Sequence, residues 1–123
     1  MTISEKQLNK VRTELKKAID KIVAELIEWD LNTLDKKLVT IIGLTEPLIE
    51  YRDDISYKLN AYQEVKMEEG KPVNATEVLV RANPLFNEVL ICNAQLSIAD
   101  KLIRTMQNRQ YTMSLRIKKN IDE

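Results

Sequence analysis

Apolar residues recur at helical spacing in a first run that begins close to the N-terminus. The run consists of Leu8, Val11, Leu15, Ile19, Ile22, Val23, Leu26 and Ile27. Their steps of three, four and one are typical of a helix that is buried along one side. Upstream, Ser4 with Gln7 and Thr2 with Glu5 both have the spacing of a capping box, which satisfies otherwise unpaired amides. We therefore expect a helix from about Ser4 to Trp29.

A second run of apolar positions starts near Asn32 and Thr33, either of which could be the N-cap of a new helix. It consists of Leu34, Leu38, Ile41, Ile42, Thr45, Leu48, Ile49, Arg52, Ile55, Leu59 and Tyr62. Pro47 lies inside this run, where it removes a backbone donor and its ring clashes with the preceding turn. We expect a kink or a short break between Gly43 and Glu46. Gly70 is the expected end of this bent helical unit.

The pattern changes in the segment 71–82, "KPVNATEVLVRA", where Val78 and Val80 alternate with other residues and no helical pattern exists. We expect a short extended link with a β-like piece. The Asn83-Pro84 pair then starts a last helix, because asparagine is a favoured N-cap and proline suits the first helical position. A broad apolar side follows, and it consists of Leu85, Phe86, Val89, Leu90, Cys92, Leu96, Ala99, Leu102, Ile103 and Met106.

These runs predict an all-α fold of three long amphipathic helices, the second kinked near Pro47, with a short extended link before the last. Two glycines and three prolines in 123 residues are far fewer turn residues than a many-stranded protein needs. The length suits one helical domain over residues 1–123. Within it, residues 107–123 form a polar, basic tail that is free to fray.

Three helices with apolar sides this wide exceed what a chain of this size buries within itself, and exposed apolar faces mark interfaces. We therefore expect a homo-oligomeric helical assembly. The expected intersubunit contacts are Leu8, Val11, Leu15, Trp29, Leu48, Ile55 and Leu59.

Cysteine content and hydropathy indicate a soluble cytoplasmic protein. Cys92 is the single cysteine, so no internal disulfide can form, and the first residues lack the apolar core of a signal peptide. No uninterrupted apolar stretch approaches the roughly 20 residues that span a bilayer. We expect no membrane partner.

The net charge is zero, but the charges are unevenly distributed. Residues 32–70 carry five basic and eight acidic side chains, whereas residues 71–123 carry eight basic and five acidic ones. No acid occurs between the first and last of Lys101, Arg104, Arg109, Arg116, Lys118 and Lys119. This pattern is typical either of a solvated helix face or of a surface that binds anions such as DNA phosphates. A second basic set on the first helix, the alternative DNA contact, consists of Lys6, Lys10, Arg12, Lys16 and Lys17.

The residues show no catalytic machinery. Without histidine there is no Ser-His or Cys-His pair and no histidine metal site, and two glycines cannot supply a phosphate-binding loop. Asp53-Asp54 and Glu68-Glu69 are adjacent pairs, whose side chains diverge on a helix rather than converge on one proton. Cys92 and Trp29 are expected to be packing residues. We expect no enzyme, no cofactor, no metal and no small-molecule substrate.

The stretch from Leu31 to Met106 resembles the small terminase subunits of tailed bacteriophages. The resemblance rests on "LNTLDKKLV", on the tyrosine-bearing "LIEYRDDISYKLNAYQEVKMEEG" that ends at a glycine, and on "RANPLFNEVLICNAQLSIADKLIRTM", which an Asn-Pro step opens. The tail "NRQYTMSLR" lacks the glycine and proline that many members have after the last long helix. No helix-turn-helix is evident before residue 31.

The resemblance implies a DNA-packaging adaptor in the host cytoplasm. Such a subunit forms a ring, binds double-stranded viral DNA and presents it to the large terminase subunit, which carries the ATPase and nuclease. The alternative is a small helical protein that binds and inhibits or regulates a partner protein, such as an anti-defence factor. A purely structural helical bundle is the third interpretation.

Overall fold

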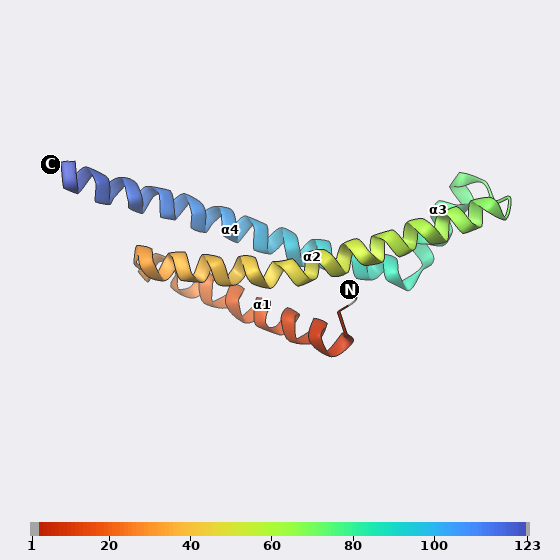
Figure 1. The fold of residues 1–123 in the computed structure, drawn as a ribbon, viewed down its shortest axis with the longest axis horizontal. Coiled ribbons are helices and arrows are strands. Elements are labelled where there is room, and N and C mark those ends of the chain that lie inside the picture. Colours follow the sequence, from red (N-terminus) through yellow and green to blue (C-terminus); the bar gives the residue numbers. More distant parts are fainter. Residues whose placement is uncertain (1–2, 123) are drawn as a thin grey trace.

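The computed structural model describes residues 3–122, and every regular element in that range is helical (Figure 1). Helix α1 spans Glu5–Glu25 and runs into η1, a turn of 3-10 helix at Leu26–Glu28. The long helix α2 spans Leu31–Glu68, the short helix α3 spans Val73–Ala82, and the long helix α4 spans Pro84–Asp122. The all-α prediction is therefore confirmed for these residues.

The two long helices pack against each other, and α1 lies along the first half of α2 (Figure 1). One row of buried or half-buried residues on α4 recurs at steps of four and three, and it consists of Leu85, Val89, Cys92, Leu96, Ala99, Ile103, Met106, Gln110 and Met113. A row on α2 has the same spacing, and it consists of Leu34, Leu38, Ile41, Thr45, Leu48, Arg52, Ile55 and Leu59. A mean period of 3.5 residues is typical of helices that pair as a coiled coil. The molecule is thus an extended helical bundle.

Helix α1 joins this bundle through residues seven positions apart. Leu8, Leu15, Ile22 and Trp29 are all at most 8% exposed and belong to the same core as Leu34, Leu48, Ala99 and Met106. The core is almost wholly aliphatic, and burial of such side chains contributes about 25 cal/mol per Å² removed from water.

Three predicted helix ends are confirmed. Ser4 and Gln7 form a capping box, with the Gln7 amide donating to the Ser4 hydroxyl at 3.2 Å and the Ser4 amide donating to the Gln7 side chain at 3.1 Å. At the end of α2, Gly70 has a φ of +91°, and the amides of Gly70 and Lys71 donate back to the carbonyls of Met67 and Lys66. This is the Schellman arrangement that favours glycine. The Asn83 side chain accepts from the Leu85 amide at 3.0 Å, as an N-cap should.

The predicted start of the second helix was wrong, and the structure contradicts a short break, one of the two alternatives expected near Pro47. Asp30, rather than Asn32 or Thr33, is the N-cap of α2, and its carboxylate accepts from the Thr33 amide at 2.8 Å. Helix α2 continues through Pro47 without interruption. The proline deprives the Gly43 carbonyl of its usual donor, but burial of α2 against both neighbouring helices outweighs that loss.

The predicted extended link was also wrong, because residues 73–82 form helix α3. Its buried residue is not apolar: Thr76 is 0% exposed, accepts from the Gln63 amide nitrogen at 3.1 Å and donates to the Val73 carbonyl at 2.7 Å. Meanwhile Val78 is 64% exposed. Leu79 and Val80 are half-buried three and four positions after Thr76, so the helical spacing is present, but a threonine occupies the most buried position and the exposed valines obscure the pattern. In Figure 1, α3 folds back along the far end of α2.

Candidate nucleic-acid interface

The basic end of α4 projects past the rest of the bundle. The Gln110 side chain donates to Asp35, near the start of α2, at 2.6 Å, and Met113 is the last residue of α4 that packs on the core. Residues 114–119, which we call the overhang, are all exposed. Figure 1 shows α4 continuing beyond the end where α1 and α2 meet. This end of the chain is therefore accessible along its whole circumference.

Most of the basic residues predicted to contact DNA lie free on this helix. Lys101, Arg116, Lys118 and Lys119 are exposed and form no ion pair with the side chains that the structure describes. Arg104 is also exposed, although its guanidinium lies 3.1 Å from the Asp100 carboxylate one turn earlier. Such an exposed pair is weak and opens readily toward a phosphate.

Arg109 has a different role from the one predicted. Its guanidinium donates to the carbonyl of Ile27 at 2.9 Å, and its Nε is buried without a hydrogen-bond partner among the described residues. A cation at the carbonyl end of a helix is favoured by the helix dipole. Arg109 thus fastens the end of α1 and η1 to α4, and it is withdrawn from the basic surface.

Arg12, from the alternative basic set, is likewise engaged inside the bundle. Its guanidinium lies 3.2 Å from Glu88, 3.2 Å from Gln95 and 3.4 Å from the Cys92 sulfur, and it lies over the Tyr51 ring at 5.8 Å. Burial alone lowers the pKa of Arg12, but the contacts with Cys92 and Glu88 outweigh it and leave the pKa above its ordinary value. Lys6, Lys10, Lys16 and Lys17 stay exposed on α1.

The residues predicted to form the oligomer interface lie mainly in the chain's own core. Leu8, Leu15, Trp29, Leu48, Ile55 and Leu59 are each at most 8% exposed, and Val11 is half-buried against them. Their side chains are covered by other helices of the same chain.

Sequence reasoning missed the polar cluster around Arg12, which joins all three packed helices. Tyr51 comes from α2, and Glu88, Cys92 and Gln95 come from α4. Burial and the neighbouring Glu88 carboxylate raise the pKa of Tyr51. The signal available in the sequence was the spacing of Glu88, Gln95, Leu102 and Arg109, seven residues apart on one edge of α4. Three of these four side chains contact α1 or η1.

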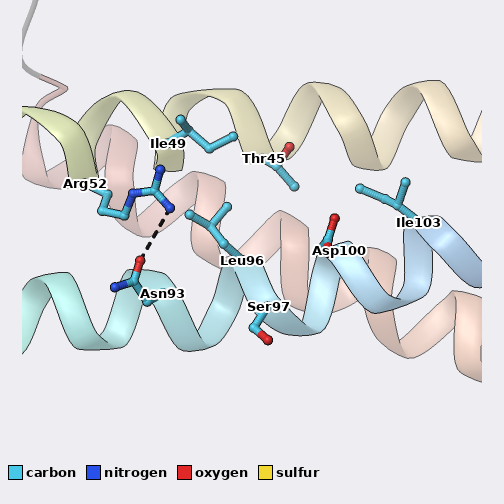
Figure 2. A pocket seen from close by; sticks show the side chains of 8 residues that line it. All are labelled: Thr45, Ile49, Arg52, Asn93, Leu96, Ser97, Asp100 and Ile103. Atoms are coloured by element: carbon cyan, nitrogen blue, oxygen red, sulfur yellow. Dashed lines mark hydrogen bonds between the residues drawn. The ribbon is translucent and has the colours of Figure 1, made fainter.

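The grooves between the helices are open and lack a convergent reactive group. One groove of about 360 Å³ lies between α2 and α4 (Figure 2). Its apolar side chains are Ile49, Leu96 and Ile103, and the Arg52 guanidinium donates to the Asn93 side chain across it at 3.4 Å. The described residues contain no cluster of three or more carboxylate or cysteine side chains able to hold a metal ion. No helix among them is long and apolar enough to span a membrane.

Comparison of the chain with protein-family models, with curated proteins and with solved structures gave no match. The interpretation of the site therefore depends on its own geometry.

Proposed function

We propose that this protein is a non-enzymatic, oligomeric DNA-binding adaptor of the DNA-packaging kind. The observation that carries the proposal is the exposed basic side of α4, on which Lys101, Arg116, Lys118 and Lys119 form no ion pair with a described side chain and which continues into the overhang beyond the bundle. The packaging role itself, with a ring of subunits and a large ATPase and nuclease subunit as partner in the host cytoplasm, rests on the resemblance to small terminase subunits.

Five basic residues supply the phosphate contacts, and they are Lys101, Arg104, Arg116, Lys118 and Lys119. Lys101 and Lys119 are eighteen positions apart, which is five helical turns, so they point in the same direction about 27 Å apart along α4. The other three lie within about 100° of that direction, so the five cations occupy one broad side of α4, which suits contacts with the phosphate backbone of double-stranded DNA. The contacts carry little base information, because phosphates are alike in every sequence.

The test is duplex binding by a variant with all five of these residues changed to glutamine and Arg109 retained. We expect weaker binding and a smaller dependence of log K on log salt, by about 0.9 for each phosphate that the variant no longer neutralises. A matched control changes Lys6, Lys10, Lys16 and Lys17, on α1, to glutamine. The proposal fails if the α4 variant binds duplex as the original chain does between about 50 and 200 mM salt, or if the α1 control loses as much affinity.

A second candidate is a regulator that binds another protein. It is favoured by exposed apolar side chains: Ile98, which lines the open groove between α1 and α4, is 52% exposed, and Val23 and Ile27 are 71% and 82% exposed. Groups of exposed apolar residues mark protein interfaces. Absence of duplex binding by the original chain even at about 50 mM salt would favour this candidate over the adaptor.

A further inference from the structure

A straight stripe of exposed side chains runs along the side of α4 that faces away from the core. Asn108 lies two positions after the fully buried Met106, which is about 200° around the helix, so it points away from the bundle. Four more exposed side chains point within about 40° of the direction of Asn108, and they are Lys101, Thr112, Leu115 and Lys119. The three uncharged residues, Asn108, Thr112 and Leu115, lie between the two lysines, and we call them the central stripe.

Helix stability does not explain the residues of the central stripe. Asparagine and threonine are less favourable in helices than alanine, lysine or glutamate, which suit exposed helix positions best. The Asn108 carboxamide has no hydrogen-bond partner among the described residues. Thr112 donates its hydroxyl to the Asn108 carbonyl at 3.0 Å, so the group that it offers to a partner is chiefly its methyl. The central stripe thus presents one free carboxamide followed by two apolar groups.

The central stripe lies where the neighbouring helices come to an end. Arg109 donates to the Ile27 carbonyl, in η1, and Gln110 donates to Asp35, near the start of α2. Beyond this level α4 continues past both neighbours (Figure 1). The outer half of α4 is therefore accessible from Asn108 through the overhang.

The basic residues surround this stripe in the way that phosphates surround the bases of a DNA groove. Arg116 and Lys118 lie about 80° to either side of the direction of Asn108. The major groove is about 12 Å wide and admits an α-helix, and a phosphate backbone follows each of its edges. A helix in this groove therefore meets phosphates on both flanks and base edges along its middle. Lys101 and Lys119, about 27 Å apart, reach phosphates where the groove curves away from a straight helix.

The chemistry of the central stripe matches adenine and thymine. In the major groove adenine presents the N7 acceptor beside the N6 donor, and a carboxamide such as that of Asn108 can bind both at once. Thymine presents a methyl group, which packs against the methyl of threonine or against other apolar groups. The seven positions from Asn108 to Leu115 extend about 10 Å along the helix, which is about three base-pair steps.

We propose that the central stripe reads bases in the major groove of DNA, with the Asn108 carboxamide bound to an adenine. Thr112 and Leu115 pack against thymine methyl groups within about three base pairs of that adenine. The inference rests on the adaptor function, because the five basic residues hold α4 in the groove. It goes beyond that function, since phosphate contacts do not distinguish one base sequence from another.

The experiment begins with selection of the tightest binders from randomised duplexes by the original chain. We expect an enriched site with one adenine and, within about three base pairs, at least one thymine. Asn108→Ala should weaken binding to this site by about 5- to 150-fold and leave binding to unselected duplex unchanged.

Altered bases in the selected site then identify the contacts. An adenine analogue with carbon in place of N7 should weaken binding by the original chain and have no further effect on Asn108→Ala. Uracil, which lacks the methyl of thymine, should weaken binding by the original chain when it replaces one thymine of the site. Thr112→Ser keeps the hydroxyl without the methyl, so this variant should be insensitive to that replacement.

The matched control is Gln107→Ala, because Gln107 is also an exposed amide but points about 100° away from Asn108. It should bind the selected site as the original chain does, and every variant should keep the helical circular dichroism spectrum. Three results would overturn the proposal: no base preference in the selected duplexes, equal losses with Asn108→Ala and Gln107→Ala, or an equal effect of the adenine analogue on the original chain and Asn108→Ala. Duplex binding without base preference would leave the adaptor function standing, whereas absence of duplex binding would overturn both.

Discussion

At the scale of single residues, Arg12 connects three helices through one side chain. Its guanidinium bridges α1 to Glu88, Cys92 and Gln95 of α4 and lies over Tyr51 of α2. Hydrogen bonds to charged groups contribute about 1.5 to 3 kcal/mol each when they are partly buried, and removing one partner leaves the other unsatisfied. Arg12 therefore holds three helices together and is not a free surface charge.

Replacing Arg12 with methionine, which keeps an unbranched apolar stem, should lower the free energy of unfolding in urea by about 1 to 3 kcal/mol. Lys10→Met, at an exposed position of the same helix, is the control and should change it by less than about 0.5 kcal/mol. In a double-mutant cycle that combines Arg12→Met with Glu88→Gln, the effects of the two changes on the free energy of unfolding should differ from additivity by at least about 0.5 kcal/mol. Equal effects of the two methionine variants would contradict the role given to Arg12.

At the scale of helices, alanine substitutions at the two glycines should have opposite effects on the free energy of unfolding. Gly43 lies inside α2, and a methyl group added there would meet no atom within 4 Å. Gly43→Ala should therefore raise the free energy of unfolding by about 0.5 to 1 kcal/mol, because alanine loses less backbone freedom on folding. Gly70 ends the same helix at a φ of +91°, so Gly70→Ala should lower it by about 1 to 2 kcal/mol. Thermal melts should show a raised melting temperature for Gly43→Ala and a lowered one for Gly70→Ala. A shift of both melting temperatures in the same direction would contradict this account.

The start of α2 should show a dependence on pH. Hydrogen bonds from the Thr33 side chain and amide hold the pKa of Asp30 below its ordinary value. A carboxylate whose pKa is lower in the folded state contributes stability above its unfolded pKa, near 4, and loses it as pH falls through the folded pKa. Asp30→Asn keeps a capping oxygen without the charge, so the melting temperature of this variant should fall less between pH 7 and pH 3 than that of the original chain. An identical pH profile would exclude this contribution.

Helices and helix ends were predictable from the sequence where a periodic apolar pattern or a capping residue specified them. The capping box at Ser4, the stop at Gly70 and the start at Asn83 are local chemistry, and all three are confirmed. Helix α3 was missed because tertiary contacts through Gln63 and Thr76 decide its conformation against the β-branched residues it contains. A short break at Pro47, one of the two alternatives expected there, does not occur, because packing along the rest of α2 stabilises the helix more than one missing hydrogen bond destabilises it.

The candidate site was only partly predictable for a similar reason. Composition identified the basic residues of α4, and the structure leaves five of the six on the surface. It could not distinguish Arg109, because the carbonyl that binds this side chain belongs to Ile27, 82 positions away in the sequence. The same limit applies to the proposed interface residues, such as Leu15 and Ile55, since an apolar pattern shows that a side is buried but not which surface covers it.

At the scale of the whole molecule, the helices form a rod rather than a globule. Helix α2 alone, with 38 residues, extends about 57 Å. A compact protein of this length would have a radius of gyration of about 14 Å. Small-angle scattering from the protein, under conditions where light scattering gives the mass of one chain, should give a clearly larger value. A value near 14 Å would mean that the helices fold back on one another in solution.

The alkylation rate of Cys92 can be used to measure how often the packed helices of this protein separate. The thiol is the only one in the chain, it is 0% exposed, and its sulfur lies under the Arg12 guanidinium of α1. An alkylating reagent reaches it only after helices separate, so the alkylation rate reports how often they do. If α1 detaches alone, Cys92 will react at urea concentrations where α2 and α4 are still helical. If the three helices open only together, the thiol will become reactive in step with the loss of helical signal, and α1 will never be free to take another partner while the protein remains folded.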